Sequence, residues 1–123
     1  MFDHVVFGVS DYEEGKNFFI KVLAPFGDLV VSESSLGVEL FRKGDQASLC
    51  IRRGAEVATP HHIAFEADNR QQVDAFYIAA LNAGGIDNGS PGLREEYHAN
   101  YYAAFVIGPD GHNIEMVCHA EEN

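Results

Sequence analysis

The sequence predicts an α+β domain of two tandem βαβββ modules, which form a paired, curved and mostly antiparallel sheet around a shared cavity. The first supporting observation is an internal repeat. A shift of 58 positions without a gap aligns identical residues at His4 and His62, Phe7 and Phe65, Phe18 and Phe76, Ile20 and Ile78, Leu23 and Leu81, and Gly27 and Gly85. The second is that both copies pass from an alternating strand pattern into a helical stripe. We therefore predict one domain, 1–123, with modules at 2–54 and 60–119.

Length, charge and cysteine spacing narrow the class of protein. The chain has 123 residues, the size of one domain, and a formal net charge of −11. This charge argues against nucleic acid and anionic membranes as partners, and no apolar run is long enough to span a bilayer. Cys50 and Cys118 lie in apolar runs without CxxC spacing, so we expect reduced core thiols. The expectation is a cytoplasmic protein.

The first module begins with a predicted strand at 3–9, where inward apolar residues alternate with His4, Val6 and Gly8. Asp11 is the expected N-cap of the following helix. The apolar stripe of this helix comprises Phe18, Phe19, Val22 and Leu23, and Pro25 to Gly27 ends it. Three short strands are expected at 28–33, 36–42 and 46–52.

The second module repeats this order after a short connector at 56–60. Its first strand starts at His62, and Asn69 caps a helix with an apolar stripe of Val73, Phe76, Tyr77, Ala80 and Leu81. One long strand, or two, is expected over 97–107. A Gly-Pro-Asp-Gly turn at 108–111 then leads into a last strand at 112–119.

Three polar side chains on strands suggest a metal site. By alternation, His4 and His62 both lie on the face opposite the helix of their module, and Glu115 is a carboxylate in an otherwise apolar strand. A single histidine in a strand is more often a satisfied core group than a ligand. Duplicated histidines with an inward carboxylate favour a divalent metal, because this donor set leaves positions open for substrate.

The paired modules, the strand-opening His4 and His62, and the closing Gly-Pro-Asp-Gly-His-Asn-Ile-Glu resemble the vicinal oxygen chelate superfamily. This superfamily includes glyoxalase I, extradiol dioxygenases, methylmalonyl-CoA epimerase and drug-resistance proteins. The resemblance covers essentially the whole chain. It implies one divalent metal per site (Zn, Ni, Co, Mn or Fe(II)), with His4, His62 and Glu115 as ligands and a substrate that chelates through neighbouring oxygens.

The chain departs from the glyoxalase I pattern at the fourth ligand, which is usually a Glu on the last strand of the first module. Matching Gly44 with Gly111 places Ser48 opposite Glu115, and serine is a poor ligand. Glu39, one strand earlier, is a possible substitute. Without a fourth ligand, the remaining set is similar to the triad of extradiol dioxygenases.

Substrate contacts are expected mainly from the segment that only the second module has. The candidates are Arg94, Tyr97, His98, Tyr101 and Tyr102, of which Arg94 can bind a carboxylate and one tyrosine can polarise an oxygen. Only one of the two adjacent tyrosines can face the site. A polar hairpin with aromatic core residues explains the segment equally well. His61 and His112, both at turns, are expected to be solvated.

Three functions follow from this pattern. The leading one is a glyoxalase-like lyase or isomerase, in which a metal stabilises an enediolate and Glu115 or Glu66 shuttles a proton. The alternatives are an Fe(II) extradiol-type dioxygenase and a non-catalytic binding protein of the bleomycin-resistance kind. In each case the expected partner is a small molecule, and the expected assembly is a homodimer that covers exposed strand edges.

Overall fold

The computed structural model describes residues 1–54, 56–57 and 60–121, so residues 58 and 59 of the predicted connector lie outside the described part. The first module contains, in order, β1 (His4–Gly8), α1 (Tyr12–Leu23), the 3-10 turn η1 (Ala24–Phe26), β2 (Leu29–Glu33), β3 (Gly37–Arg42) and β4 (Ser48–Arg52). The second contains β5 (His62–Glu66), α2 (Arg70–Asn82), the short strands β6 (Ile86–Asp87) and β7 (Gly92–Leu93), β8 (Tyr102–Ile107), η2 (Pro109–Gly111) and β9 (Asn113–Cys118). The predicted pair of βαβββ modules is confirmed.

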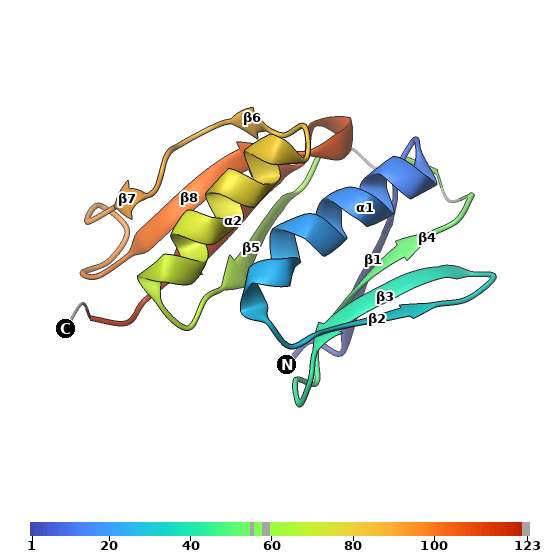
Figure 1. Ribbon diagram of the computed structural model, residues 1–123, viewed down its shortest axis with the longest axis horizontal. Coiled ribbons are helices and arrows are strands. Elements are labelled where there is room, and N and C mark those ends of the chain that lie inside the picture. The colour runs from blue at the N-terminus through green and yellow to red at the C-terminus, as the bar shows by residue number, and fades with distance from the viewer. Residues whose placement is uncertain (55, 58–59, 122–123) are drawn as a thin grey trace.

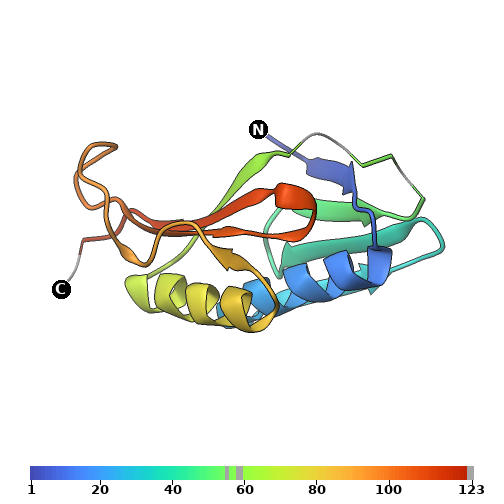
Figure 2. The same cartoon turned by 90° about the horizontal axis from the view of Figure 1, so that it is seen from above.

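The two modules have matching sheets. One sheet has the strand order β1-β4-β3-β2 and the other β5-β9-β8-β6, with β7 also paired to β8. In both, the first strand runs parallel to the last, β1 with β4 and β5 with β9, and the other pairs are antiparallel. The modules lie side by side with α1 next to α2 (Figure 1), and both helices cover the same side of the sheets (Figure 2). Each sheet therefore has a second face that points away from the helices.

Each helix begins at the expected cap. The Asp11 side chain accepts a hydrogen bond from the Glu14 backbone N–H at 3.0 Å, and the Asn69 side chain accepts one from Gln72 at 2.9 Å. These bonds satisfy backbone donors that have no partner within the helix. The stripe of α1 is buried as predicted, whereas on α2 Leu81 stays 36% exposed.

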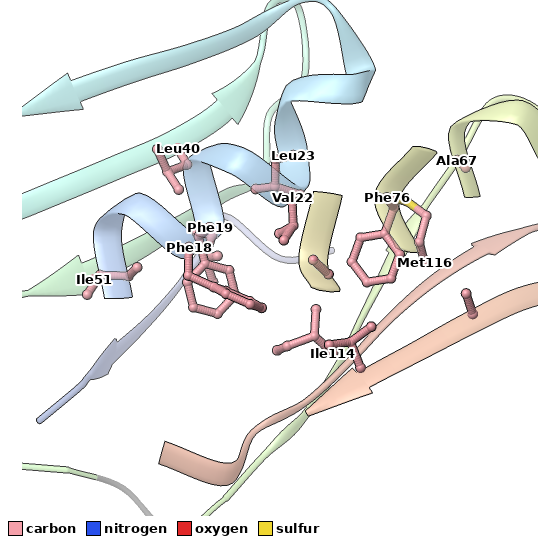
Figure 3. Packing of buried hydrophobic residues seen from close by; sticks show 14 of the residues in the cluster. Phe18, Phe19, Val22, Leu23, Leu40, Ile51, Ala67, Phe76, Ile114 and Met116 are labelled. Atoms are coloured by element: carbon pink, nitrogen blue, oxygen red, sulfur yellow. The ribbon is translucent and has the colours of Figure 1, made fainter. Parts of the chain in front are cut away.

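One apolar cluster draws residues from both modules (Figure 3). Phe18 and Phe19 of α1 contact each other edge to face, with ring centres 5.3 Å apart. Phe76 of α2 and Ile114 of β9 are fully buried in the same cluster. Gly108 lets the turn before β9 approach this core, because a Cβ there would lie 2.9 Å from the Phe18 ring. The two modules therefore share one apolar core.

Polar contacts also join the modules. The Ser10 hydroxyl and backbone N–H donate to the Asp110 carboxylate at 2.6 and 2.9 Å, and Asp110 itself adopts a φ of 59°. Arg42 forms ion pairs with Asp28 of its own module and with Asp68 of the second module, both at 2.9 Å. These contacts fix the position of one module against the other.

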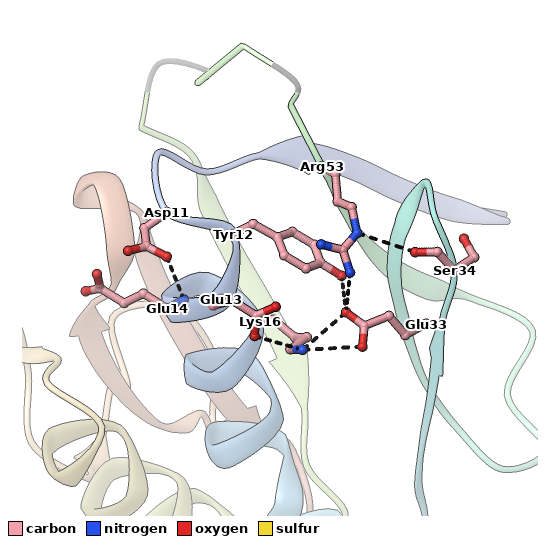
Figure 4. A network of polar contacts seen from close by, with 8 residues as sticks. All are labelled: Asp11, Tyr12, Glu13, Glu14, Lys16, Glu33, Ser34 and Arg53. Carbon is pink, nitrogen blue, oxygen red and sulfur yellow. Dashed lines mark hydrogen bonds and ion pairs between the residues drawn. The ribbon is translucent and has the colours of Figure 1, made fainter.

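A further network stays within the first module (Figure 4). Tyr12 of α1 donates to Glu33 of β2 at 2.6 Å, and Lys16 and Arg53 pair with the same carboxylate. The Arg53 guanidinium lies 4.1 Å from the Tyr12 ring centre, a cation–π contact. The hydrogen bond from Tyr12, followed by that from Lys16, lowers the pKa of Glu33. The network ties the start of α1 to the sheet.

The predicted strand at 97–107 is too long. Two turns precede β8: the Tyr97 N–H donates to the Arg94 carbonyl at 3.0 Å, and the Tyr101 N–H donates to His98 at 3.3 Å. Asn100 has a φ of 63°, which a strand does not accommodate. The strand therefore begins only at Tyr102, and residues before it form a loop over the sheet.

Other expectations have mixed outcomes. Cys50 and Cys118 are both free thiols, but only Cys118 lies in the core as predicted, whereas Cys50 is partly exposed. Within the described ranges, neither helix combines the length and apolar character needed to cross a membrane.

His61 is exposed as expected, but the prediction of a solvated His112 is wrong, since this side chain is 0% exposed. His112 Nδ1 accepts a hydrogen bond from the His61 N–H at 2.9 Å, and its ring packs 5.1 Å from that of Phe7.

Burial of His112 makes the protein sensitive to acid. Its pKa is lowered, first because burial penalises the charged imidazole and second by the nearby His61, while Asp110 acts in the opposite direction. The unfolded chain has an ordinary histidine pKa of about 6.5, so it binds more protons than the folded state just below that value. We expect the stabilisation to be complete above about pH 6.5 and to be lost as the pH falls through the lower, folded-state pKa.

Urea unfolding of wild type and His112→Asn between pH 7.5 and about 5 measures this effect. Asparagine keeps an acceptor for the His61 N–H but cannot titrate. The midpoint of the wild type should fall more steeply with acid than that of the variant. Equal slopes would contradict a titrating His112.

Candidate functional site

A buried carboxylate lies at the centre of the site. Glu115 on β9 is 2% exposed, and one of its oxygens lies 2.8 Å from Nε2 of His62 on the adjacent strand β5. The Tyr101 hydroxyl donates to the other oxygen. The strand register places Ala64 opposite Glu115, so His62, two residues earlier, projects on the same face of the sheet. This face is the one that points away from the helices, as predicted.

The partners of Glu115 explain how a carboxylate is tolerated here. A buried carboxylate without hydrogen bonds would cost several kcal/mol, and Glu115 has one partner for each oxygen. Burial and the hydrogen bond to Glu115 raise the pKa of Tyr101 to about 12. Tyr101 therefore keeps its proton and acts as a donor throughout the physiological pH range.

These three residues border a pocket of about 650 Å³ on the second module. The other residues that line it are Glu96, Tyr97, His98, Phe105 and Asn113. Of the five predicted substrate contacts, the structure thus places Tyr97, His98 and Tyr101 around one pocket. Because the volume lies in the range of small-molecule sites, the pocket is large enough for a metabolite-sized ligand.

The other two predicted contacts lie elsewhere. The Arg94 guanidinium donates to the Ser90 carbonyl at 2.7 Å and lies 5.5 Å from the Phe105 ring centre, outside the pocket lining. Tyr102 faces the helix side, where its hydroxyl donates to Asp74 of α2 at 2.6 Å. The expectation that only one of the two adjacent tyrosines faces the site is confirmed.

Three lining residues were not among the predicted contacts, and the strand register identifies two of them. Phe105 pairs with Glu115, and Asn113 pairs with His62, so both share the face of the site. Glu96 lies in a turn and carries no such signal. His119, near the end of the chain, packs its ring 5.2 Å from that of Tyr101.

The first module carries His4 on its own sheet. His4 pairs with Ser48, and its Nδ1 lies 2.7 Å from Asp3. Among the residues that the structure describes, no three His, Cys, Asp or Glu side chains gather closely enough to hold a metal. One chain therefore brings His62 and Glu115 together but does not add His4 to them.

The register corrects the predicted match between the modules. His4 pairs with Ser48 where His62 pairs with Asn113, and Val6 pairs with Cys50 where Ala64 pairs with Glu115. Cys50, not Ser48, therefore occupies the place equivalent to Glu115. The Ser48 hydroxyl instead donates to Glu39 at 2.7 Å. Alignment on the turn glycines failed because the two turns differ in length by two residues.

A second cavity of about 650 Å³ lies between the modules, but none of His4, His62 and Glu115, which were predicted to face one shared cavity, lines it. Its lining is mostly apolar and includes Phe26, Leu40, Ile63 and Phe65. Glu66 borders this cavity, whereas His62 and Glu115 do not. Four residues of strand, about 13 Å, separate Glu66 from His62, so the structure does not place this carboxylate in the His62–Glu115 pocket.

His62 and Glu115 supply two of the ligand types that a divalent first-row metal binds. An imidazole nitrogen and a carboxylate oxygen 2.8 Å apart are suitable ligand types for a first-row metal, and they lie in an accessible pocket. Two ligands fall short of the three that such sites use. His62 and Glu115 thus fit part of a metal site, and completion requires a ligand from outside this group.

Comparison with known proteins agrees with this fold. The family model "Glyoxalase/Bleomycin resistance protein/Dioxygenase superfamily" matches residues 1–116. A glyoxalase/bleomycin resistance protein from Albidiferax ferrireducens T118 is 26% identical, with a TM-score of 0.80 over 96% of this chain and 98% of that one. A family enzyme from Burkholderia phytofirmans PsJN is 14% identical, with a TM-score of 0.73 over 96% and 98% of the two chains. A search of curated proteins finds no match. The chain belongs to the glyoxalase/bleomycin resistance protein/dioxygenase superfamily.

Proposed function

We propose that this protein is a divalent-metal-dependent enzyme of the glyoxalase type, a lyase or isomerase for a small substrate with two neighbouring oxygens. The observation that carries the proposal is the buried Glu115, held between His62 and Tyr101 at the floor of a pocket of about 650 Å³. Members of the superfamily typically bind a divalent metal, and perturbed, convergent polar groups in a pocket are typical of active sites.

Each residue of the group has a role in this proposal. His62 and Glu115 are the metal ligands of this pocket, and a bound metal would supply a Lewis acid that stabilises negative charge on the substrate oxygens. Tyr101 orients Glu115 by donating to one carboxylate oxygen. A bound metal would take the lone pair of His62 Nε2 and so replace its 2.8 Å hydrogen bond with Glu115, and Glu115 is the carboxylate that shuttles a proton to or from the substrate. The walls of the pocket exclude water from one side of the substrate.

We infer that His4 of a second copy completes the ligand set. His4 lies on an edge strand, β1, with its side chain about half exposed at 52%. Phe2, Val5 and Val6 beside it are also exposed, at 69, 44 and 39%. Neighbouring exposed apolar residues on an edge strand favour contact with another protein surface. In a homodimer, each site can combine His4 of one chain with His62 and Glu115 of the other. Such a dimer supplies the missing ligand and covers the exposed apolar residues beside His4.

The test is a metal titration of freshly prepared apoprotein, followed by turnover assays on hemithioacetals and 2-oxo compounds. We expect saturable binding of Zn, Ni, Co, Mn or Fe(II) and metal-dependent isomerase or lyase activity. Oxygen consumption with catechols in the iron-loaded protein would instead identify the dioxygenase. Refusal to bind any of these metals would contradict both enzymatic functions.

A binding protein without catalysis is the second candidate. It is favoured by the mutual satisfaction of His62, Glu115 and Tyr101, which need no metal to form a stable group. Such a protein would use the same pocket to hold a ligand. Ligand affinity that is unchanged by His62→Ala and by metal chelators would support this candidate over the enzyme.

A further inference from the structure

We propose that the part of the pocket formed by Glu96 and Tyr97 selects substrates that carry a positive charge and disfavours anionic ones. This inference rests on the proposed function, because it assigns a substrate class to the same pocket. It concerns the part of the substrate that does not react, and so it can be tested apart from metal chemistry.

The charge of the pocket is the first basis. Within the described residues, the lining contains two carboxylates, Glu96 and Glu115, and no lysine or arginine. Both carboxylate oxygens of Glu115 are already hydrogen-bonded, one to His62 and the other to Tyr101. In the described part of the chain, no hydrogen bond or ion pair of the Glu96 side chain is found. Glu96 is therefore the carboxylate that remains available to pair with a ligand.

The nearest arginine in the sequence does not neutralise this carboxylate. Arg94 is held by the Ser90 carbonyl at 2.7 Å and by the ring of Phe105. The backbone at Gly89 and Gly92 packs against the guanidinium. A Cβ at Gly89 would lie 3.2 Å from a guanidinium nitrogen, and a Cβ at Gly92 would lie 3.0 Å from one. The guanidinium is thus fixed outside the pocket lining, and the formal charge of −11 further lowers the local concentration of anions.

The aromatic rings beside Glu96 are the second basis. The rings of Tyr97 and Tyr101 meet edge to face with centres 5.1 Å apart, which forms an aromatic corner, and Tyr97 is 56% exposed. The face of an aromatic ring attracts cations, and a neighbouring carboxylate adds to that attraction. A backbone hydrogen bond from Tyr97 to Arg94 fixes the turn that carries Glu96. The corner is therefore suited to an ammonium or guanidinium group.

The experiment uses three probes that share the same two neighbouring oxygens. They are catechols that carry an aminoethyl, an ethyl or a carboxymethyl group at one ring position, and hence a charge of plus one, zero or minus one. Isothermal titration calorimetry of the full chain, done anaerobically with and without Zn²⁺, gives the three affinities. We expect the cationic probe to bind about ten-fold more tightly than the anionic one.

The matched variants are Glu96→Gln and Glu95→Gln. Glu95 is an exposed neighbour that does not line the pocket, so its replacement changes the total charge equally. Glu96→Gln should reduce the preference for the cation to about two-fold, and Glu95→Gln should leave it near ten-fold. Equal affinities in the wild type, no binding of the cationic probe, or equal effects of the two variants would overturn the inference. Zinc-independent affinities with the charge preference intact would instead count against the proposed metal function alone.

Discussion

Replacement of Glu115 by Gln is expected to abolish high-affinity metal binding and to lower turnover by two to four orders of magnitude. The substitution keeps the size of the side chain but removes its charge and one acceptor oxygen. Outer partners of metal ligands contribute about 10- to 100-fold to affinity, and loss of a direct ligand should cost more. Loss of a proton-transferring carboxylate adds about 10²- to 10⁴-fold in rate. Metal titration monitored by calorimetry and steady-state assays measure the two effects.

Glu95→Gln is the matched control for this variant, because it removes a carboxylate from the same module outside the pocket. We expect its metal affinity and turnover to equal those of the wild type. Circular dichroism should show that both variants are folded. Metal affinity in Glu115→Gln equal to that in Glu95→Gln would remove Glu115 from the ligand set.

Replacement of Phe76 by Ala is expected to lower the free energy of unfolding by about 3–5 kcal/mol. Phe76 lies on α2, is 0% exposed and belongs to the cluster shared by the two modules. Truncation removes most of a buried ring and leaves a cavity that close-packed neighbours cannot fill. The loss is a large fraction of the stability of a typical domain. Urea unfolding followed by circular dichroism gives the value.

Ile78→Ala provides the control on the same helix, since Ile78 is 61% exposed. Its expected effect is within about 0.5 kcal/mol. The comparison separates loss of core packing from any change in helix propensity. Similar losses for the two variants would mean that the α2 stripe is not the buried face.

The internal repeat predicted the fold because each module repeats one local pattern. Asp11 and Asn69 cap helices whose apolar stripes pack on a sheet, and these are rules of short range. Alternation along β5 and β9 also placed His62 and Glu115 on one face, because the period of a strand fixes the direction of each side chain. The local pattern was therefore sufficient to predict that His62 and Glu115 of the candidate site lie together.

The remainder depends on tertiary placement. Alternation cannot tell which sheet of which chain faces His4, and one chain leaves it apart from Glu115. His112 is buried because its turn packs against Phe7 of the other module, a contact between residues distant in sequence. The match of Glu115 with Cys50 follows from hydrogen-bonded register, which the turn glycines do not report.

A heterodimer of two inactive variants tests the composite site most directly. His4→Ala and Glu115→Ala chains with different tags would be co-expressed and purified as the mixed dimer, and bound metal counted by elemental analysis. In a two-fold dimer, one of the two sites then keeps His4 from one chain and both His62 and Glu115 from the other. The account predicts one tightly bound metal per mixed dimer, two in the wild type and none in either variant alone. A mixed dimer without metal would contradict a site shared between chains.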